Sequence, residues 1–138
     1  MTPTAFDTAP YETKDSGHRG QYASGMLREP DTGRPRFDLL VPENVPYGKQ
    51  LLTRCAALMA RGAEKYESRN WEKADSREEL DRMKASAFRH FMQWLTGETE
   101  EDHAAAVVFN LLAAESTAYA IGQKHTAVGN DRAVQDPV

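Results

Sequence analysis

Two histidines and a short run of acids lie close to the ends of two predicted helices. His90 precedes Glu98 by eight residues, and the acidic run from Glu98 to Asp102 leads directly into His103. Imidazole with carboxylate suits a divalent ion such as Mn²⁺ or Zn²⁺, whereas carboxylates alone suit Mg²⁺. A lone histidine on a half-apolar helix is more often a packed residue, and the helix dipole favours acids at a helix start without any metal. Metal chemistry at this junction is therefore one of two open interpretations, and for the acidic run alone we favour a solvated face.

Polar residues in apolar surroundings, and one compact polar motif, give further candidates. Asn110 follows His103 by seven residues, so both lie on one face of an almost entirely apolar helix. A buried amide costs free energy unless it is hydrogen-bonded, so Asn110 either fixes helix register or points into a ligand cavity. Arg69, Asn70 and Trp71 combine a guanidinium for phosphate, an amide for a base edge and an indole for stacking. Trp71 could equally cover one end of a helical bundle.

Two arginines beside a proline are a further candidate phosphate site. Arg34 and Arg36 flank Pro35 and would be presented stiffly, although solvated arginines are the commoner case. Glu64, next to Lys65, is by itself an ordinary surface glutamate. The sequence has no glycine-rich phosphate loop, no HExxH, no CxxC and no serine elbow, so the common catalytic signatures do not apply.

The elements that must position these residues are helices. Apolar residues at spacings of three and four predict a first helix between residues 47 and 66. Ser76 with Glu79 fits a capping box that begins a second helix, which we expect to stop at Gly97. A third helix is expected from about residue 99 to about residue 122. We find no β-strand pattern.

These elements predict an all-α protein, an antiparallel helical bundle of three main helices. We expect a flexible N-terminal arm over residues 1–24, a helical domain over residues 25–122 and a disordered tail over residues 123–138. Three helices of this size leave apolar surface uncovered, Trp94 and Val107 being candidates. We therefore expect a homo-oligomer, either a dimer or a tetramer.

Bulk properties exclude several classes of protein. The 138 residues carry a net charge of −4 with a pI near 5.6, which argues against binding a nucleic acid polymer. Cys55 is the only cysteine and lies among apolar residues, where a buried small side chain is expected rather than a nucleophile. No stretch approaches the length of a membrane span and no signal pattern is present, so we expect no membrane partner and a cytoplasmic location.

Several short motifs occur in a particular order. They are Gly33-Arg34-Pro35-Arg36-Phe37-Asp38-Leu39-Leu40, Gly62-Ala63-Glu64-Lys65-Tyr66, Asn70-Trp71, Arg89-His90 with Trp94, Gly97-Glu98, and His103 with Asn110. Their order and spacing resemble the phage-type dATP/dGTP diphosphohydrolase N-terminal-domain family. That family looks like a branch of the all-α MazG-like nucleoside triphosphate pyrophosphohydrolases. The resemblance covers about residues 24 to 115.

The resemblance implies hydrolysis of a nucleoside triphosphate, with purine preference (dGTP or dATP), to monophosphate and pyrophosphate with Mg²⁺ or Mn²⁺. If the protein is phage-encoded, the host cytoplasm would be its location. The implied metal ligands are Glu64, His90, Glu98 and His103, and Glu64 and Glu98 would also be catalytic. The implied substrate-binding residues are Arg34, Arg36, Asp38, Lys65, Arg69, Asn70, Trp71, Arg89 and Asn110.

Two alternatives stay open, because the Glu-Glu-x-x-Glu and Glu-x-x-Asp motifs of the superfamily are absent. Ala87 and Ala106 stand near the positions where acids would be expected. The first alternative is a bundle that binds a nucleotide without cleaving it. The second is an interaction protein whose buried polar residues only set helix register.

Overall fold

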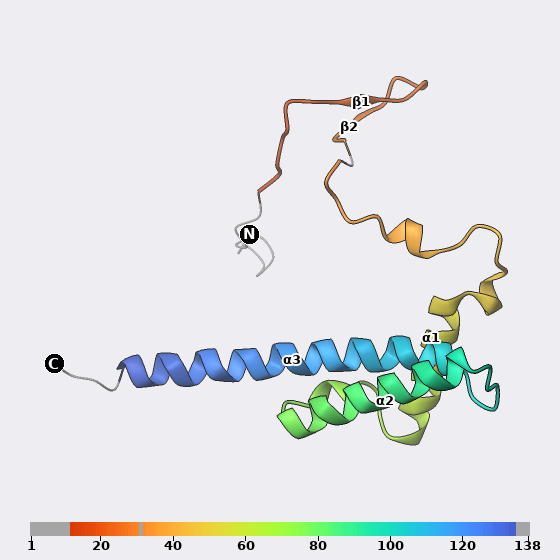
Figure 1. Cartoon of the computed structure of the whole chain (residues 1–138). Helices are drawn as coiled ribbons and strands as arrows, with labels where there is room; N and C mark the ends of the chain where they lie inside the picture. The colour runs from red at the N-terminus through yellow and green to blue at the C-terminus, as the bar shows by residue number, and fades with distance from the viewer. Residues whose placement is uncertain (1–11, 31, 135–138) are drawn as a thin grey trace. The chain divides into compact units, whose positions relative to one another are not determined.

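The computed structural model describes residues 12–30 and 32–134, with side chains described as far as residue 128 (Figure 1). The chain divides into two units, Met1–Phe37 and Asp38–Val138, which are described separately. In the first unit, strands β1 (Gly20–Gln21) and β2 (Leu27–Arg28) pair antiparallel. The expectation of no strand was wrong here, because two residues per strand are too few to show a period. The hairpin crosses the expected boundary at residue 24.

A tight turn closes the hairpin. The Tyr22 amide donates to the Met26 carbonyl at 2.9 Å, and Gly25 adopts a φ of 90°, which glycine accepts without strain. Arg19 bridges Asp15 and Glu29 at 2.7 and 3.0 Å, which joins the segment before β1 to the end of β2. This part of the predicted arm therefore has local structure.

The first long helix, α1 (Leu51–Lys65), confirms the helix predicted between residues 47 and 66. Two short 3₁₀ segments precede it, η1 (Phe37–Leu40) and η2 (Tyr47–Lys49). Gln50 lies between η2 and α1, and its side-chain nitrogen Nε2 donates to the Val45 carbonyl at 2.9 Å. Cys55 is buried in α1, as expected for a small apolar residue. Burial raises the pKa of its thiol, so Cys55 stays protonated.

The second long helix, α2 (Arg77–Leu95), begins and ends as predicted. The Ser76 hydroxyl accepts from the Glu79 amide at 3.2 Å, and the Glu79 carboxylate accepts from the Asp75 amide at 3.1 Å. This is a variant of the capping box, in which Glu79 bonds the amide one residue before the N-cap and also accepts from the Ser76 hydroxyl at 2.7 Å. At the other end Gly97 takes a φ of 84°, and its amide donates to the Trp94 carbonyl at 3.1 Å. The connection before α2 contains the 3₁₀ segment η3 (Asn70–Lys73).

The third helix, α3 (His103–Val134), is longer than predicted. It begins a few residues after the expected start, and the Asp102 carboxylate caps it by accepting a hydrogen bond from the Ala105 amide at 3.2 Å. The expected end at Gly122 was wrong, so residues 123–134 of the expected tail are helical. Gly122 is not among the glycines with positive φ, and a glycine with helical φ does not end a helix.

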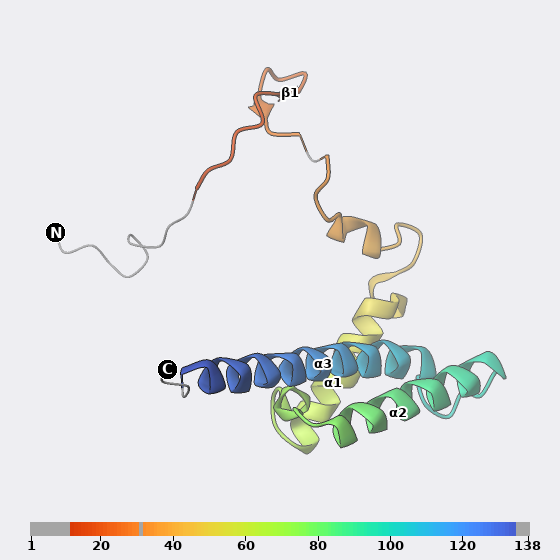
Figure 2. The ribbon, with the colours of Figure 1, turned by 60° about the vertical axis from the view of Figure 1, so that its left-hand side comes forward.

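The three helices confirm the all-α fold. α2 and α3 lie side by side and antiparallel, and α1 crosses α3 (Figures 1 and 2). Small side chains dominate the core and allow close helix contact; they are Cys55, Ala74, Ala87, Ala105, Ala106, Ala113 and Ala114, joined by Leu80. Four polar residues are buried with them, namely His90, His103, Asn110 and Thr117.

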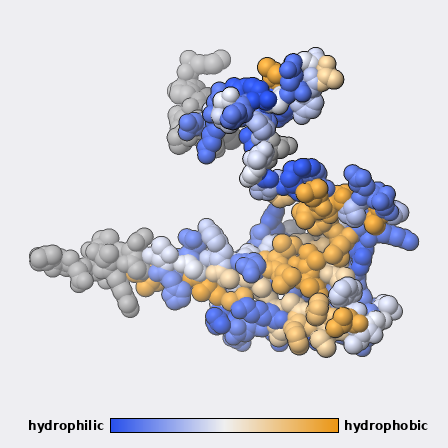
Figure 3. All heavy atoms as spheres, turned by 45° about the horizontal axis from the view of Figure 1, so that its top comes forward, coloured by the Kyte–Doolittle hydropathy of each residue, from blue (hydrophilic) through white to orange (hydrophobic). Residues whose placement is uncertain are grey.

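Large hydrophobic side chains remain exposed on the helical unit, where Figure 3 shows them gathered on one face. On α2 the exposed residues Phe88, Phe91, Met92 and Leu95 recur at spacings of three and four, forming what we term the α2 stripe. Trp94 is 53% exposed, as expected. The three helices therefore leave part of their apolar surface uncovered.

One helix among the described residues is long and apolar enough to cross a membrane, by length and composition only. It is the His103–Val128 part of α3, with a hydropathy of 1.5 in its most apolar window. The expectation that no stretch approaches this length was therefore wrong. Since α3 packs against both α1 and α2, it also fits a core helix of a helical bundle.

Candidate functional site

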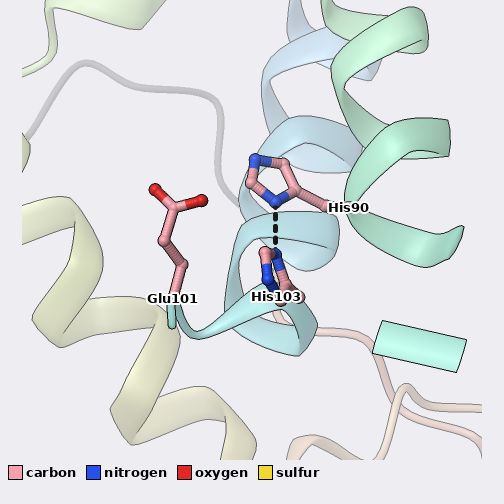
Figure 4. A group of neighbouring side chains, drawn as sticks. All are labelled: His90, Glu101 and His103. Carbon is pink, nitrogen blue, oxygen red and sulfur yellow. Dashed lines mark hydrogen bonds between the residues drawn. The ribbon is translucent and has the colours of Figure 1, made fainter. Parts of the chain in front are cut away.

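Two buried histidines meet where α2 turns into α3. His90 lies near the end of α2 and His103 is the first residue of α3, and the reversal at Gly97 brings these two turns together. Their Nδ1 atoms are 2.9 Å apart, and the two residues are 8% and 2% exposed (Figure 4). Buried imidazoles in direct contact are a plausible ligand pair for a divalent ion.

Carboxylates from the connecting loop complete two groups of possible metal ligands among the described residues. Ligand atoms of His90, Glu101 and His103 all lie within 4.8 Å of one another, and so do those of Glu98, Glu100 and His103. Figure 4 shows the Glu101 carboxylate on the same side as the second ring nitrogen of His90. Glu100 accepts a hydrogen bond from His103 Nε2 at 2.8 Å. His103 therefore stands between an acid on one ring nitrogen and His90 on the other.

Burial and charge keep His90 neutral. Burial lowers the pKa of His90, and the positive charge of Arg89 lowers this pKa further. Arg89 Nη2 lies 3.5 Å from His90 Nε2. A neutral imidazole has a nitrogen lone pair, which a metal ion requires.

An ion pair ties the start of α3 to α1. Arg54 donates to both oxygens of Asp102, at 2.8 and 2.7 Å. This hydrogen-bonded guanidinium lowers the pKa of Asp102. The Glu101 and His103 backbones flank Asp102, so this pair fixes the loop that carries the histidine–carboxylate group against α1.

A cavity of about 640 Å³ adjoins the histidines, and we term it the polar cavity. Its walls come from α1, α2, the connecting loop and α3: Leu58, Arg61, Gly62, Lys65, Ser86, His90, Glu100, Glu101, Asp102, Ala106, Phe109 and Asn110. Arg61 and Lys65 add two cationic side chains to a cavity that the three acids also line. Asn110 donates to the Ala106 carbonyl of its own helix at 2.8 Å and also lines the polar cavity, so its role stays a prediction.

A second cavity of about 270 Å³, the aromatic cavity, lies next to the first. It is lined by Leu58, Met59, Gly62, Ala63, Tyr66, Glu67, Arg69, Asn70, Trp71 and Phe109. Trp71 meets Phe109 edge to face, with ring centroids 6.3 Å apart and an interplanar angle of 86°. Leu58, Gly62 and Phe109 line both cavities. A side-chain carbon built at Gly62 meets nothing within 4 Å, so this glycine keeps space open at the shared wall.

The structure brings together most of the site residues expected from the sequence. The polar cavity is lined by Lys65, His90 and Asn110, and His103 lies behind it in contact with His90. The aromatic cavity is lined by Arg69, Asn70 and Trp71. Arg89 is exposed beside His90. Glu98 lies with Glu100 and His103 beside a separate cavity of about 420 Å³.

Two expected residues of the helical unit, Glu64 and Asp38, line neither cavity. Glu64 is exposed on α1 and joins neither group of possible metal ligands among the described residues. Arg34 and Arg36 belong to the first unit, and Asp38 lies in η1. A role for these residues stays a prediction.

Sequence reasoning missed Arg54, Arg61, Glu100 and Glu101 as site residues. Arg54, Leu58, Arg61 and Lys65 recur at three or four residues, so a cationic edge beside the apolar face of α1 could have been recognised. The acids were interpreted as a solvated face. Only the reversal at Gly97, which returns the loop to the histidines, gives them a partner.

Fold and site together define an all-α protein with a histidine–carboxylate group beside two adjoining cavities, one polar and one aromatic. The chain belongs to the family described as dATP/dGTP diphosphohydrolase, N-terminal, whose model matches residues 24–126. No curated protein and no solved structure matches the chain. The matched region begins within the turn between β1 and β2 and ends within α3, so it includes both cavities.

Proposed function

We propose that this protein hydrolyses purine deoxynucleoside triphosphates to a monophosphate and pyrophosphate, using Mg²⁺ or Mn²⁺. The family name supports the reaction class and the purine deoxynucleotide. The observation that carries the proposal is the polar cavity, which is lined by His90 and Glu101 together with Arg61 and Lys65. Groups that can hold a cation and groups that can hold phosphate thus share one space.

The residues present fit a divalent ion. Two imidazole nitrogens and one carboxylate lie within 4.8 Å of one another, which is a mixed donor set suited to Mn²⁺. His90, Glu101 and His103 would hold the ion, with Glu98 as a further acid near His103. A bound divalent ion would neutralise phosphate charge and lower the pKa of a coordinated water. Glu64, by contrast, lies outside this group.

The chain's own residues would divide the nucleotide between the two cavities. Arg61 and Lys65 are placed to bind phosphate oxygens, and Trp71 offers a ring face or edge to the base. Asn70 and Arg69 border the same aromatic cavity and can hydrogen-bond the nucleoside. The open space at Gly62 would let one ligand occupy both cavities. We propose Arg34, Arg36, Asp38 and Arg89 as additional substrate-binding residues, on the resemblance alone.

The proposed hydrolysis changes no oxidation state, so it needs no oxidant or reductant. A water oxygen forms a bond to the α-phosphorus while the bond from that phosphorus to the α–β bridging oxygen breaks. The bridging oxygen leaves with pyrophosphate, and the proton released from water passes to a carboxylate. Glu101 belongs to the same ligand group as His90 and lines the polar cavity, so we assign it this role. Arg61 and Lys65 would stabilise the charge on the leaving group.

We further propose that the protein is a homo-oligomer that acts in the cytoplasm, where nucleoside triphosphates are available. The exposed α2 stripe supports this, since Phe88 and Leu95 are 67% and 61% exposed in the single chain. A second copy would cover this surface as a further helix of the bundle.

One observation favours a second candidate function, nucleotide binding without cleavage. Ala87 and Ala106 are buried near the positions where the superfamily has acids, so the ligand group holds fewer carboxylates. Such a protein would bind a triphosphate tightly and release no product.

The test measures product formation from each deoxynucleoside triphosphate with Mg²⁺ or Mn²⁺, by anion-exchange separation. We expect monophosphate and pyrophosphate from dATP and dGTP, with loss of activity in chelator. Glu101→Gln should lower turnover at least about 100-fold, since it removes the assigned base. Glu115→Gln, on the exposed part of α3, is the matched control. Binding without product would select the second candidate. The absence of both binding and turnover would reject both candidates.

A further inference from the structure

Both ring nitrogens of His103 are engaged, and their partners determine where its proton lies. Nε2 is 2.8 Å from Glu100 Oε1, and Nδ1 is 2.9 Å from His90 Nδ1. An ionised carboxylate only accepts hydrogen bonds, and a neutral imidazole carries one N–H. The proton of His103 therefore lies on Nε2, which leaves a lone pair on Nδ1. The His103 side chain is 1% exposed, so its ring nitrogens are shielded from water.

We infer that Glu100 is a positioning residue that holds His103 in the Nε2–H tautomer and so keeps its Nδ1 open for a metal ion. This inference rests on the metal site of the proposed function. Glu100 itself would not touch the ion, because its carboxylate is bonded to the far side of the ring. A carboxylate behind a ligating histidine orients the ring and raises its basicity.

The same geometry assigns the proton of His90 in the metal-free protein. Since His103 Nδ1 is an acceptor, His90 Nδ1 must donate to it, and His90 Nε2, 3.5 Å from Arg89 Nη2, carries the lone pair. An ion held by both Nδ1 atoms needs both lone pairs. The His90 proton must then leave Nδ1 and a proton must reach Nε2, so the net charge is unchanged. Loading the site would switch the tautomer of His90 and leave that of His103 fixed.

Side-chain ¹H–¹⁵N correlation spectra of the full chain test this directly, without nucleotide. In metal-free protein we expect His103 protonated on Nε2 and His90 protonated on Nδ1. Addition of diamagnetic Zn²⁺ should move the proton of His90 to Nε2 and leave His103 unchanged. Zn²⁺ affinity, measured by calorimetry, should fall about 10- to 100-fold in Glu100→Ala. Glu100→Gln keeps an acceptor oxygen and should restore the tautomer.

Glu115→Ala is the matched control, since it removes an equal charge from an exposed part of α3. Glu100 is 58% exposed, so its replacement leaves the core packing intact. The inference is overturned if His103 carries its proton on Nδ1, or on both nitrogens, in the metal-free chain. Unchanged Zn²⁺ affinity in Glu100→Ala would also overturn it. Because neither readout involves nucleotide, either can fail while hydrolysis stands, and hydrolysis can fail while both succeed.

Discussion

Among single residues, Gly62 lowers the stability of helix α1 but leaves space in the wall that the two cavities share. A glycine inside a helix costs about 1 kcal/mol relative to alanine, so Gly62→Ala should raise the free energy of unfolding by about that amount. Gly62→Leu should fold as well, because a Cβ atom there meets nothing within 4 Å, and the rest of the leucine side chain would fill space at the wall shared by both cavities. We expect nucleotide affinity to fall at least about 10-fold in Gly62→Leu, measured by calorimetry. Unchanged affinity would show that the ligand does not span the two cavities.

Arg69 carries backbone strain at the edge of the aromatic cavity. Its φ of 60° lies in the left-handed region, which costs a residue with a side chain about 1 kcal/mol. Its ion pair with Glu72 is exposed and offers little compensation. Arg69→Gly should therefore raise the melting temperature while weakening nucleotide binding, as differential scanning fluorimetry with and without dATP would show. A lower melting temperature in Arg69→Gly would contradict the strain, and equal dATP shifts in both proteins would contradict a contact with nucleotide.

At the scale of elements, Asp102 both begins α3 and joins it to α1. Asp102→Asn keeps an acceptor for the Ala105 amide but loses the charge that pairs with Arg54, which should cost about 0.5 kcal/mol in this partly exposed setting. Asp102→Ala also loses the helix cap and should cost about 1 kcal/mol more. Urea unfolding measures both. Equal stability of the three proteins at pH 7 would contradict the dual role.

The same pair gives a pH dependence with a definite sign. Arg54 lowers the pKa of Asp102 from 3.8, so the folded state binds this proton less readily than the unfolded chain. The stabilisation is therefore present above pH 3.8 and is lost as the pH falls through the folded pKa. We expect the difference in unfolding free energy between wild type and Asp102→Asn to shrink in that acid range. A difference that grows on acidification would contradict this sign.

The limits of some helices could be predicted from the sequence, whereas those of other elements could not. Ser76, Glu79 and Gly97 fix the limits of α2 through local capping chemistry, which is readable from a few adjacent residues. The end of α3 was not readable, because Gly122 resembles a stop signal whose outcome depends on its φ angle. The hairpin at residues 20–28 was missed because its strands are too short to show alternation.

Some residues of the candidate site could be identified from the sequence and others could not. His90, His103 and Asn110 could be recognised because polar residues are unexpected on apolar helix faces. Glu101 and Arg61 could not, because exposed charges are ordinary until the fold places them around one space. The predicted Glu64 was chosen from a motif, and the crossing of α1 over α3 instead directs Arg61 and Lys65 to the polar cavity.

At the scale of the whole molecule, the α2 stripe predicts self-association. Phe91→Glu should place a charge in the middle of the stripe and shift the mass in solution toward that of a monomer, as measured by light scattering after size-exclusion chromatography. Arg82→Glu, on an exposed position of α2 outside the stripe, is the control. A wild-type protein that is monomeric at all concentrations would contradict the prediction.

We predict that one divalent ion binds at His90, His103 and Glu101, beside the polar cavity, which we propose binds the phosphates. Anomalous diffraction from crystals soaked with Mn²⁺ and a non-hydrolysable dATP analogue tests it most directly. We expect one manganese peak about 2 Å from ligand atoms of these residues, with the phosphates next to it on the side of Arg61 and Lys65. Manganese bound elsewhere, or no peak between the two histidines, would contradict it.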